Sequence, residues 1–362
     1  RECVIIIDQL DSVAATDLCK SLVGFIKTLV ALPQVKVLIV SRTYELQHDP
    51  DISSLIFQKI ESGQLGVEQV ASYLSQIGIE SPSQALVELA RNLLNLSLIA
   101  EAAKSSTNHI LDLTDDIDLW KQYYLTIQQR EGEEIAEYVL KLAQEVTSQG
   151  EQTFSVSFPK SEYRRKLLSR CILIEAPGRR YTFRHEQLQD FLCAYSLLPK
   201  KLKFNEILRE LGKNGLKEGV LKWLHKLYHD EFPDEEASFV DDVLAANEDL
   251  PFYTRTSILE NLREQSDPTT DTAKVIFKYS ADWAYHRFFF DGLDNPAWII
   301  PLLGTGFFFT PPDPIEVKPG SFQLPGWPAG EYLARFANQY EDIVAAVVRY
   351  IRTENWRVQE IL

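Results

Sequence analysis

Two short apolar runs near the start of the chain predict strands of a parallel β-sheet. Residues 3–7 (CVIII) and 35–40 (VKVLIV) are β-branched and almost uniformly apolar, as is typical of strands buried on both faces of such a sheet. The segment between them has apolar side chains at helical spacing and predicts an amphipathic crossover helix. The pattern therefore predicts one βαβ unit. The apolar positions of its helix are Leu18, Leu22, Phe25, Ile26 and Leu29.

Polar residues follow both predicted strands. Asp8 and Asp11 come after the first strand, and Ser41 and Arg42 come after the second. The carboxyl ends of strands in open α/β sheets face the ligand crevice. We therefore expect these four side chains to point into one site.

The pattern then becomes helical. Residues 51–128 carry apolar stripes at spacings of three and four and predict a small helical domain. Within 129–200, a helix ending at Gly150 is followed by the alternating run QTFSVSF, a second helix, a hairpin around Pro177–Gly178 and a third helix. This order of elements predicts a winged helix.

Residues 201–362 again show helical spacing. Short helices joined by turns predict stacked helical hairpins, as in a HEAT-like solenoid, although no sharp repeat motif is detectable. Prolines forbid a helix over residues 310–328, where we expect either an ordered loop anchored by Phe322 and Trp327 or an insertion with its own contacts. The predicted fold class is thus a multidomain, mostly α protein that begins with part of an α/β sheet. Its C-terminal aromatics are expected in the core, and any exposed beside the loop are the first candidates for a sensor surface.

Composition narrows the classes of function. The 362 residues carry a formal net charge of −15, which disfavours a general nucleic-acid or anionic-membrane surface. No window predicts a transmembrane helix and no secretory signal is visible, so a cytoplasmic location is expected. The four cysteines are dispersed in apolar settings and indicate free, buried thiols in a reducing compartment. The chain begins with arginine and contains no methionine, so we expect an internal piece of a longer protein.

Several residues offer a functional and a structural interpretation. Asp8 and Asp11 match a Walker B arrangement, in which one carboxylate lies near a magnesium ion and the other polarises water, but Asp11 could equally cap the next helix. Arg42 could clamp a γ-phosphate or be an ordinary surface arginine. His185 could bind a phosphate or report closure of the domain, or it could cap the helix that follows it or be a half-buried structural residue. His225 and His229 lie four residues apart, but no cluster of cysteines or carboxylates in the sequence joins them into a metal site.

Taken together, these stretches resemble the NACHT branch of the STAND signal-transduction NTPases. The stretches are VIIIDQLDSV, VKVLIVSRTYE, ELARNLLNLSLIA and FRHEQLQDFLCAYSL, and the resemblance covers about residues 1–200. It is greatest to bacterial antiviral and regulatory members with C-terminal helical repeats. It implies an ATP or ADP switch with bound Mg²⁺, self-oligomerisation on activation, and a protein trigger at the repeats. Residues 1–50 would then be the C-terminal part of the P-loop NTPase core.

The resemblance also assigns roles to individual residues. Asp8 would match the magnesium-associated aspartate, and Asp11 the acid near the hydrolytic water. Arg42, next to Ser41, would match the sensor arginine that contacts the nucleotide. His185 would match the histidine that touches the bound diphosphate.

The sequence departs from the family pattern at three points. Ser12 stands where a further acid is common, so we expect slow or absent hydrolysis. Asn92 is followed by Leu93 rather than by the proline that lies beside the adenine. No GxxxxGK[ST] motif occurs, so we expect the phosphate-binding loop upstream of Arg1.

Two other functions stay open. One is a winged-helix regulator that binds nucleic acid through clustered basic residues. The other is a protein-interaction scaffold with an inactive nucleotide site. The basic cluster consists of Arg164, Arg165, Lys166, Arg170, Arg179, Arg180 and Arg184.

Overall fold

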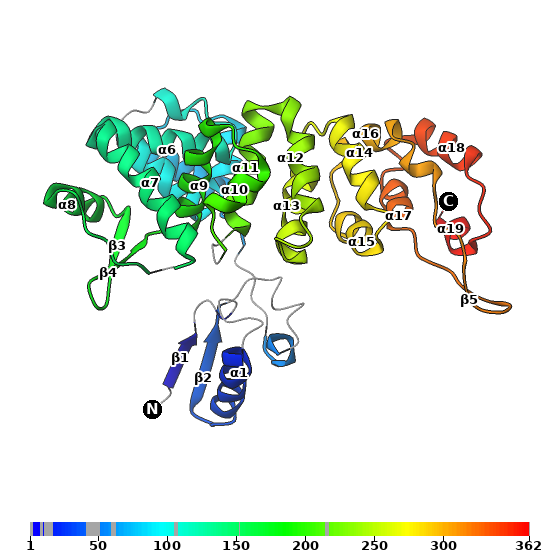
Figure 1. Ribbon diagram of the computed structural model, residues 1–362, viewed down its shortest axis with the longest axis horizontal. Coiled ribbons are helices and arrows are strands. Elements are labelled where there is room, and N and C mark those ends of the chain that lie inside the picture. The colour runs from blue at the N-terminus through cyan, green and yellow to red at the C-terminus, as the bar shows by residue number, and fades with distance from the viewer. Residues whose placement is uncertain are drawn as a thin grey trace. The chain divides into compact units, whose positions relative to one another are not determined.

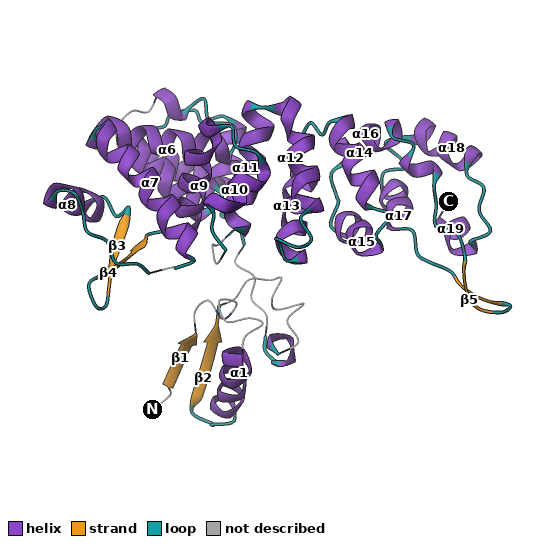
Figure 2. Ribbon diagram, viewed as in Figure 1, coloured by secondary structure: helices purple, strands orange, loops and turns teal. Residues whose placement is uncertain are grey.

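The computed structural model forms two compact units, residues 1–64 and residues 65–362. It describes residues 3–7, 10, 17–40, 51–58, 63–104, 108–151, 153–213 and 217–361. Helices dominate these ranges and the sheets are small, which confirms the mostly α prediction (Figure 2).

The first unit contains the predicted βαβ arrangement. Strands β1 (Cys3–Ile7) and β2 (Val35–Ile39) pair in parallel, with Cys3 opposite Val35 and Ile7 opposite Ile39. Helix α1 (Asp17–Val30) is the crossover between them (Figure 1). A small core lies between α1 and one face of the strands. It contains Leu10, Cys19, Val23, Ile26, Ile52 and Leu55, with Ile7, Leu22 and Ile39 packed against it.

Among the described residues of this unit, only one face of the parallel pair is covered, so these residues do not bury the strands on both faces as predicted. Parallel neighbours share a face, and Val4, Ile6 and Leu38 lie on the side opposite α1. Their exposed fractions are 61%, 65% and 47%. A single crossover helix can shield one face only, which leaves the other apolar face open to solvent.

The second unit begins with four helices: α3 (Val67–Gln76), α4 (Gln84–Ala90), α5 (Leu93–Ala103) and α6 (Asp116–Glu131). Side chains that accept backbone N–H bonds define three of their starts, at Ser83, Asn92 and Asp115. Asn92 is therefore a helix cap, and Leu93 is the first residue of α5.

A helix–hairpin–helix segment follows. It contains α7 (Glu133–Gln149), α8 (Ser161–Ser169), the antiparallel strands β3 (Leu173–Ala176) and β4 (Arg180–Phe183), and α9 (Glu186–Leu197). Gly178 and Arg179 both have positive φ, as a tight hairpin turn requires. The predicted strand QTFSVSF is reduced to one bridge between Phe154 and Tyr181. The partner strand β4 has only four residues and also pairs with β3. This limits how many residues of QTFSVSF can pair with β4.

The remaining helices form two rows of neighbours. Helices α9, α11 (Glu218–Glu231), α13 (Phe252–Glu264), α15 (Trp283–Asp291), α17 (Pro328–Arg335) and α19 (Trp356–Ile361) contact one another in series. A second series contains α10 (Phe204–Glu210), α12 (Pro233–Ala245), α14 (Thr270–Tyr279) and α16 (Ile299–Gly304). Helix α18 (Glu341–Tyr350) follows α17 in the chain. Alternate helices thus lie side by side, as expected of stacked helical pairs (Figure 1).

The proline-rich segment contains a small hairpin, formed by β5 (Ile315–Lys318) and β6 (Ser321–Gln323), in which every residue is exposed. Trp327 is fully buried and anchors the end of the segment, as predicted. Phe322 was expected to be a second anchor, but it is 58% exposed, because it lies in the hairpin rather than against the helices. Of the other C-terminal aromatics expected in the core, Phe289, Phe290, Phe307 and Phe308 are buried, Phe288 is partly buried, and Phe309 is 40% exposed.

Candidate functional site

Four of the predicted nucleotide-site residues lie outside the described residues: Asp8, Asp11, Ser41 and Arg42. The described backbone shows how the strands that precede them end. The Val40 N–H donates to the Ile7 carbonyl at 2.8 Å, and the Leu10 N–H donates to the Val40 carbonyl at 3.0 Å. Strands β1 and β2 therefore end side by side at the same edge of the sheet.

His185 is described, and it lies where β4 gives way to α9. Its backbone is extended and occupies the N-cap position, but its side chain makes no capping hydrogen bond. Instead, its carbonyl accepts bonds from the N–H groups of Leu188 and Gln189. His185 thus occupies the N-cap position without a side-chain cap and is half-buried, which agrees with the structural interpretation of this residue.

The His185 imidazole is half-buried and electrically neutral at physiological pH. Burial lowers its pKa below the ordinary 6.5, and the adjacent Arg184 cation lowers it further. The ring has no hydrogen-bond partner among the residues that the structure describes. A neutral imidazole offers one donor and one acceptor, so His185 can still bind a ligand.

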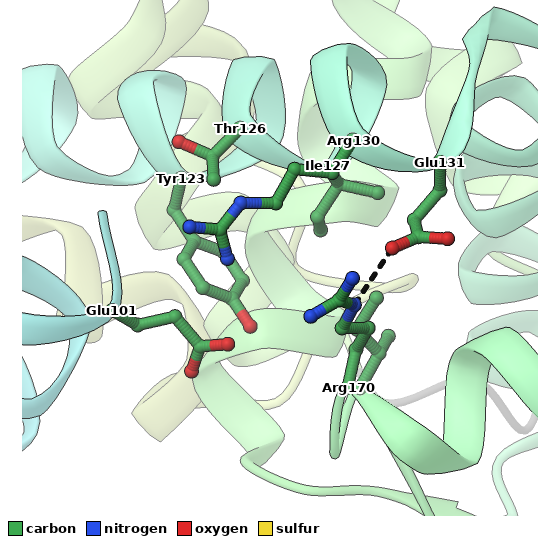
Figure 3. A pocket seen from close by; sticks show the side chains of 8 residues that line it. Glu101, Tyr123, Thr126, Ile127, Arg130, Glu131 and Arg170 are labelled. Atoms are coloured by element: carbon green, nitrogen blue, oxygen red, sulfur yellow. Dashed lines mark hydrogen bonds and ion pairs between the residues drawn. The ribbon is translucent and has the colours of Figure 1, made fainter. Parts of the chain in front are cut away.

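A pocket lies between the helices α5 and α6 and the segment that joins α8 to β3 (Figure 3). It is a small cavity of about 20 Å³, next to space that is open to solvent. The Arg184 N–H donates to the carbonyl of Ile172 at 3.0 Å, which ties the residue before His185 to the pocket wall. The lining residues are Glu101, Tyr123, Thr126, Ile127, Arg130, Glu131, Arg170 and Ile172.

Glu131 is the most enclosed charge of the pocket, with 5% of its side chain exposed. The Arg170 Nε donates to its Oε1 at 2.7 Å, and the Lys166 Nζ lies 3.6 Å from its Oε2. Lys166 also donates to the backbone carbonyl of Glu131 at 3.2 Å. Two cations thus compensate this one buried carboxylate, which is the condition for keeping a charge out of water.

Glu101 and Tyr123 form the other side of the pocket, and Arg184 lies beside Glu101. The Arg184 Nη1 lies 3.9 Å from the Glu101 Oε2, a loose ion pair. The pKa of Tyr123 is raised, first by burial and then by the Glu101 carboxylate, so its hydroxyl keeps its proton. In Figure 3 the Glu101 side chain enters from α5, and the Tyr123 and Arg130 side chains enter from α6.

Reasoning from the sequence missed this pocket, although α6 carried a signal. Tyr123, Ile127 and Arg130 are spaced by four and then three residues, so they share one face of the helix. Tyr123 and Ile127 are buried, so Arg130 places a cation on an otherwise apolar face. A charged residue at the end of an apolar stripe could have indicated this pocket.

A second polar cluster lies between α11, α12 and the segment after α13. The buried carboxylate of Glu236 contacts His225 Nε2 at 2.9 Å and His229 Nδ1 at 3.2 Å, and it also accepts a bond from Gln265. His229 Nε2 lies 3.1 Å from the carboxylate of Asp267. We call these residues the Glu236 cluster. Within the ranges that the structure describes, no group of three or more His, Cys, Asp or Glu side chains could hold a metal ion.

The basic residues of segment 160–184 are largely paired with carboxylates. Five of the seven candidates for nucleic-acid binding have an ion-pair partner, while Arg165 and Arg179 have none among the described residues. Paired cations contribute less to phosphate contacts than free ones, so this surface gives the nucleic-acid hypothesis no specific support. The pairs are Arg164–Glu175, Lys166–Glu131, Arg170–Glu131, Arg180–Glu151 and Arg184–Glu101.

None of the helices in the described ranges combines the length and the apolar composition that a bilayer crossing requires. Comparison of the chain with models of known protein families and with curated proteins finds no match.

Proposed function

We propose that the chain is part of an ATP- or ADP-controlled signalling switch of the STAND type, NACHT branch. The observation that carries the proposal is the parallel pairing of β1 and β2, whose ends lie at one edge of the sheet. In sequence, Asp8 and Asp11 follow the first of these ends, and Ser41 and Arg42 follow the second. Carboxylates and an arginine at the carboxyl edge of a parallel sheet suit a nucleotide–magnesium site.

The proposed roles follow from the chemistry of the side chains. Asp8 would hold Mg²⁺, through its water shell, and the ion would neutralise charge on the phosphates. Asp11 would polarise an attacking water, and Arg42 would clamp the terminal phosphate with charge-assisted hydrogen bonds. Ser12, in place of a further acid, leaves hydrolysis slow in this proposal.

His185 is proposed to contact the diphosphate of the bound nucleotide. Its half-buried, neutral ring has no hydrogen-bond partner among the described residues, which suits a donor to phosphate. Residues 129–200 would act as a winged helix that carries this histidine, supported by the order α7, α8, β3–β4, α9. Population shift between an ADP-bound and an ATP-bound arrangement would then operate the switch.

The two rows of helices from α9 to α19 support a role as a sensor. Stacked helical pairs present an extended surface, and a protein trigger is the proposed ligand of that surface. Binding of the trigger would favour self-oligomerisation, and defence against viruses is the proposed context.

The test uses the full-length protein and fluorescent ADP. Loss of a hydrogen bond to a charged phosphate costs about 1.5–3 kcal/mol, so we expect H185A to weaken ADP binding by roughly tenfold or more. D8N and R42A should weaken Mg²⁺-dependent ATP binding. H109A is the matched control, because His109 is exposed and lies outside the proposed site. Unchanged nucleotide binding in D8N, R42A and H185A would refute the proposal.

The variant D11N distinguishes the nucleotide switch from a scaffold without nucleotide chemistry. This variant should change ATP turnover or oligomerisation if the site operates. Identical turnover and identical assembly in the wild type and D11N would favour a scaffold.

A further inference from the structure

The pocket between α5, α6 and the α8–β3 segment holds more positive than negative charge. Arg130, Arg170, Arg184 and Lys166 provide four cations in or beside it. Three carboxylates face them, those of Glu101, Glu131 and Glu162. One positive charge is therefore left without a counter-ion in this cluster.

Arg130 carries that surplus charge. It is half-buried, lines the pocket, and forms no ion pair or hydrogen bond with any residue in the described part of the chain. Arg170 uses its Nε to bind Glu131, and neither of its terminal nitrogens donates a hydrogen bond to a described residue. Figure 3 shows both guanidinium groups within the pocket, Arg130 from α6 and Arg170 from the turn after α8. No nitrogen of Arg130 is both buried and unpartnered, so its donors reach solvent and are available to an anion.

We propose that this pocket binds a phosphate group. Two guanidinium groups on different elements, together with the Tyr123 hydroxyl, provide donors from more than one direction, which suits a tetrahedral oxyanion better than a planar carboxylate. Thr126 adds no donor, because its hydroxyl already donates to the Gln122 carbonyl at 2.9 Å. Ile127 and Ile172 form the apolar part of the lining, which strengthens the charge interaction by limiting water.

Glu101 gives the pocket a means of selecting phosphate over sulfate. Near neutral pH inorganic phosphate retains at least one O–H group, which can donate a hydrogen bond to the Glu101 carboxylate. Sulfate has no such proton and would place its lone pairs against that carboxylate. A like-charge contact of this kind costs binding free energy, so the acidic side chain favours the protonated oxyanion. The inference does not depend on the proposed nucleotide switch, because none of its residues is assigned to that site.

The test is calorimetric titration of the full chain with sodium phosphate, and separately with sodium sulfate at matched ionic strength, at pH 7. We expect saturable phosphate binding that R130Q weakens by at least tenfold, about the loss of one charge-assisted contact. R165Q is the matched control, because it removes the same charge from an exposed position that is not part of the pocket. E101Q should narrow the preference for phosphate over sulfate.

A second set of titrations identifies the source of the phosphate group. ADP is titrated into the wild type, into R130Q and into the nucleotide-site variant D8N. Inorganic phosphate binding that R130Q weakens and D8N preserves assigns the pocket to the free ion. ADP binding that R130Q weakens, without binding of inorganic phosphate, assigns the pocket to the phosphate of a larger ligand.

R130K is a second variant that controls for misfolding of R130Q. It keeps the charge but removes the planar fork, so it should fold as the wild type by circular dichroism and bind phosphate more weakly. Saturable binding of phosphate and sulfate with equal affinity, or affinities of R130Q for both phosphate and ADP equal to those of the wild type, would overturn the proposal.

Discussion

Replacing Glu236 with glutamine tests whether the Glu236 cluster stabilises the rows of helices. Burial alone would raise the pKa of this fully buried carboxyl, but hydrogen bonds from His225 and His229 lower it from 4.5 to about 2. One pKa unit corresponds to about 1.4 kcal/mol, so these contacts favour the charged form by roughly 3 kcal/mol. Glutamine cannot carry that charge and leaves the His229 cation without its buried counter-ion. We expect E236Q to lower the free energy of unfolding by about 3 kcal/mol.

The two histidines of the cluster hold different charges. Both nitrogens of His229 face carboxylates, and the hydrogen bond to Glu236 raises its pKa from 6.5 to about 9, so it is an imidazolium. Burial lowers the pKa of His225, despite its hydrogen bond to Glu236, so this ring stays neutral. If the neutral His225 ring carries its proton on Nε2, its Nδ1 is an unprotonated acceptor. Nδ1 is buried and has no hydrogen-bond partner among the described residues, which agrees with this assignment.

These pKa directions predict how stability depends on pH. Glu236 has a lowered pKa, so its contribution is present above about 4.5 and is lost as the pH falls toward 2. His229 has a raised pKa, so its contribution is complete below about 6.5 and is lost as the pH rises through about 9. The contribution of the pair is therefore largest between about pH 5 and 6.5, and it should decline toward pH 9.

The assay is urea denaturation at pH 5.5, 7.5 and 9, followed by tryptophan fluorescence. This signal sums all six tryptophans, of which Trp223 lies on α11 together with both histidines. E235Q is the control, since Glu235 is the exposed neighbour of Glu236 on the same helix. A loss below about 1 kcal/mol in E236Q, or a decline between pH 5.5 and 9 as steep as in the wild type, would refute the reasoning.

Three further predictions concern packing and reactivity. A Cβ at Gly330 would lie 2.0 Å from a buried tryptophan ring, so G330A should destabilise the protein by about 1–3 kcal/mol. Gly24, on helix α1, has no atom within 4 Å of an added Cβ, so G24A should stabilise the protein by up to about 1 kcal/mol. Thermal melts in which the two variants have similar stability would contradict this. W120A removes a fully buried ring and should cost about 3–5 kcal/mol in urea denaturation, and a loss under 1 kcal/mol would show that the site collapses without penalty. Burial raises the pKa of the Cys193 thiol to about 12. Iodoacetamide at pH 8 should therefore label the exposed Cys171 before Cys193, as detected by mass spectrometry. Equal labelling of the two cysteines would contradict the burial of Cys193.

The sequence predicted the helices and strands correctly where a single apolar periodicity extends through a whole segment. The strands and crossover helix of residues 3–39 and the helices of residues 201–309 follow from apolar spacing alone. Errors arose where pairing partners decide the outcome: QTFSVSF alternates like a strand, yet β4 offers it a single bridge at Phe154. Phe322 was misplaced for a similar reason, because hydrophobicity does not reveal whether a neighbour exists to bury it.

The candidate site was harder to foresee. His185 was found because it begins a helix just after a hairpin, and that position is confirmed, whereas its proposed contact with a nucleotide stays a prediction. The phosphate pocket combines α5, α6 and the turn after α8, so its residues are spread from Glu101 to Ile172 in sequence. No local pattern brings such residues together, because tertiary packing of the helices decides which side chains meet.

The hairpin Ile315–Gln323 has a practical consequence. None of its side chains is buried, while the segment that carries it is anchored by Trp327 at its far end. Lengthening the tip at Gly320, which has positive φ and no atom close to its missing Cβ, would leave the helix rows intact. A peptide tag or a fluorescent reporter inserted there would label the protein internally without disturbing its hydrophobic interior.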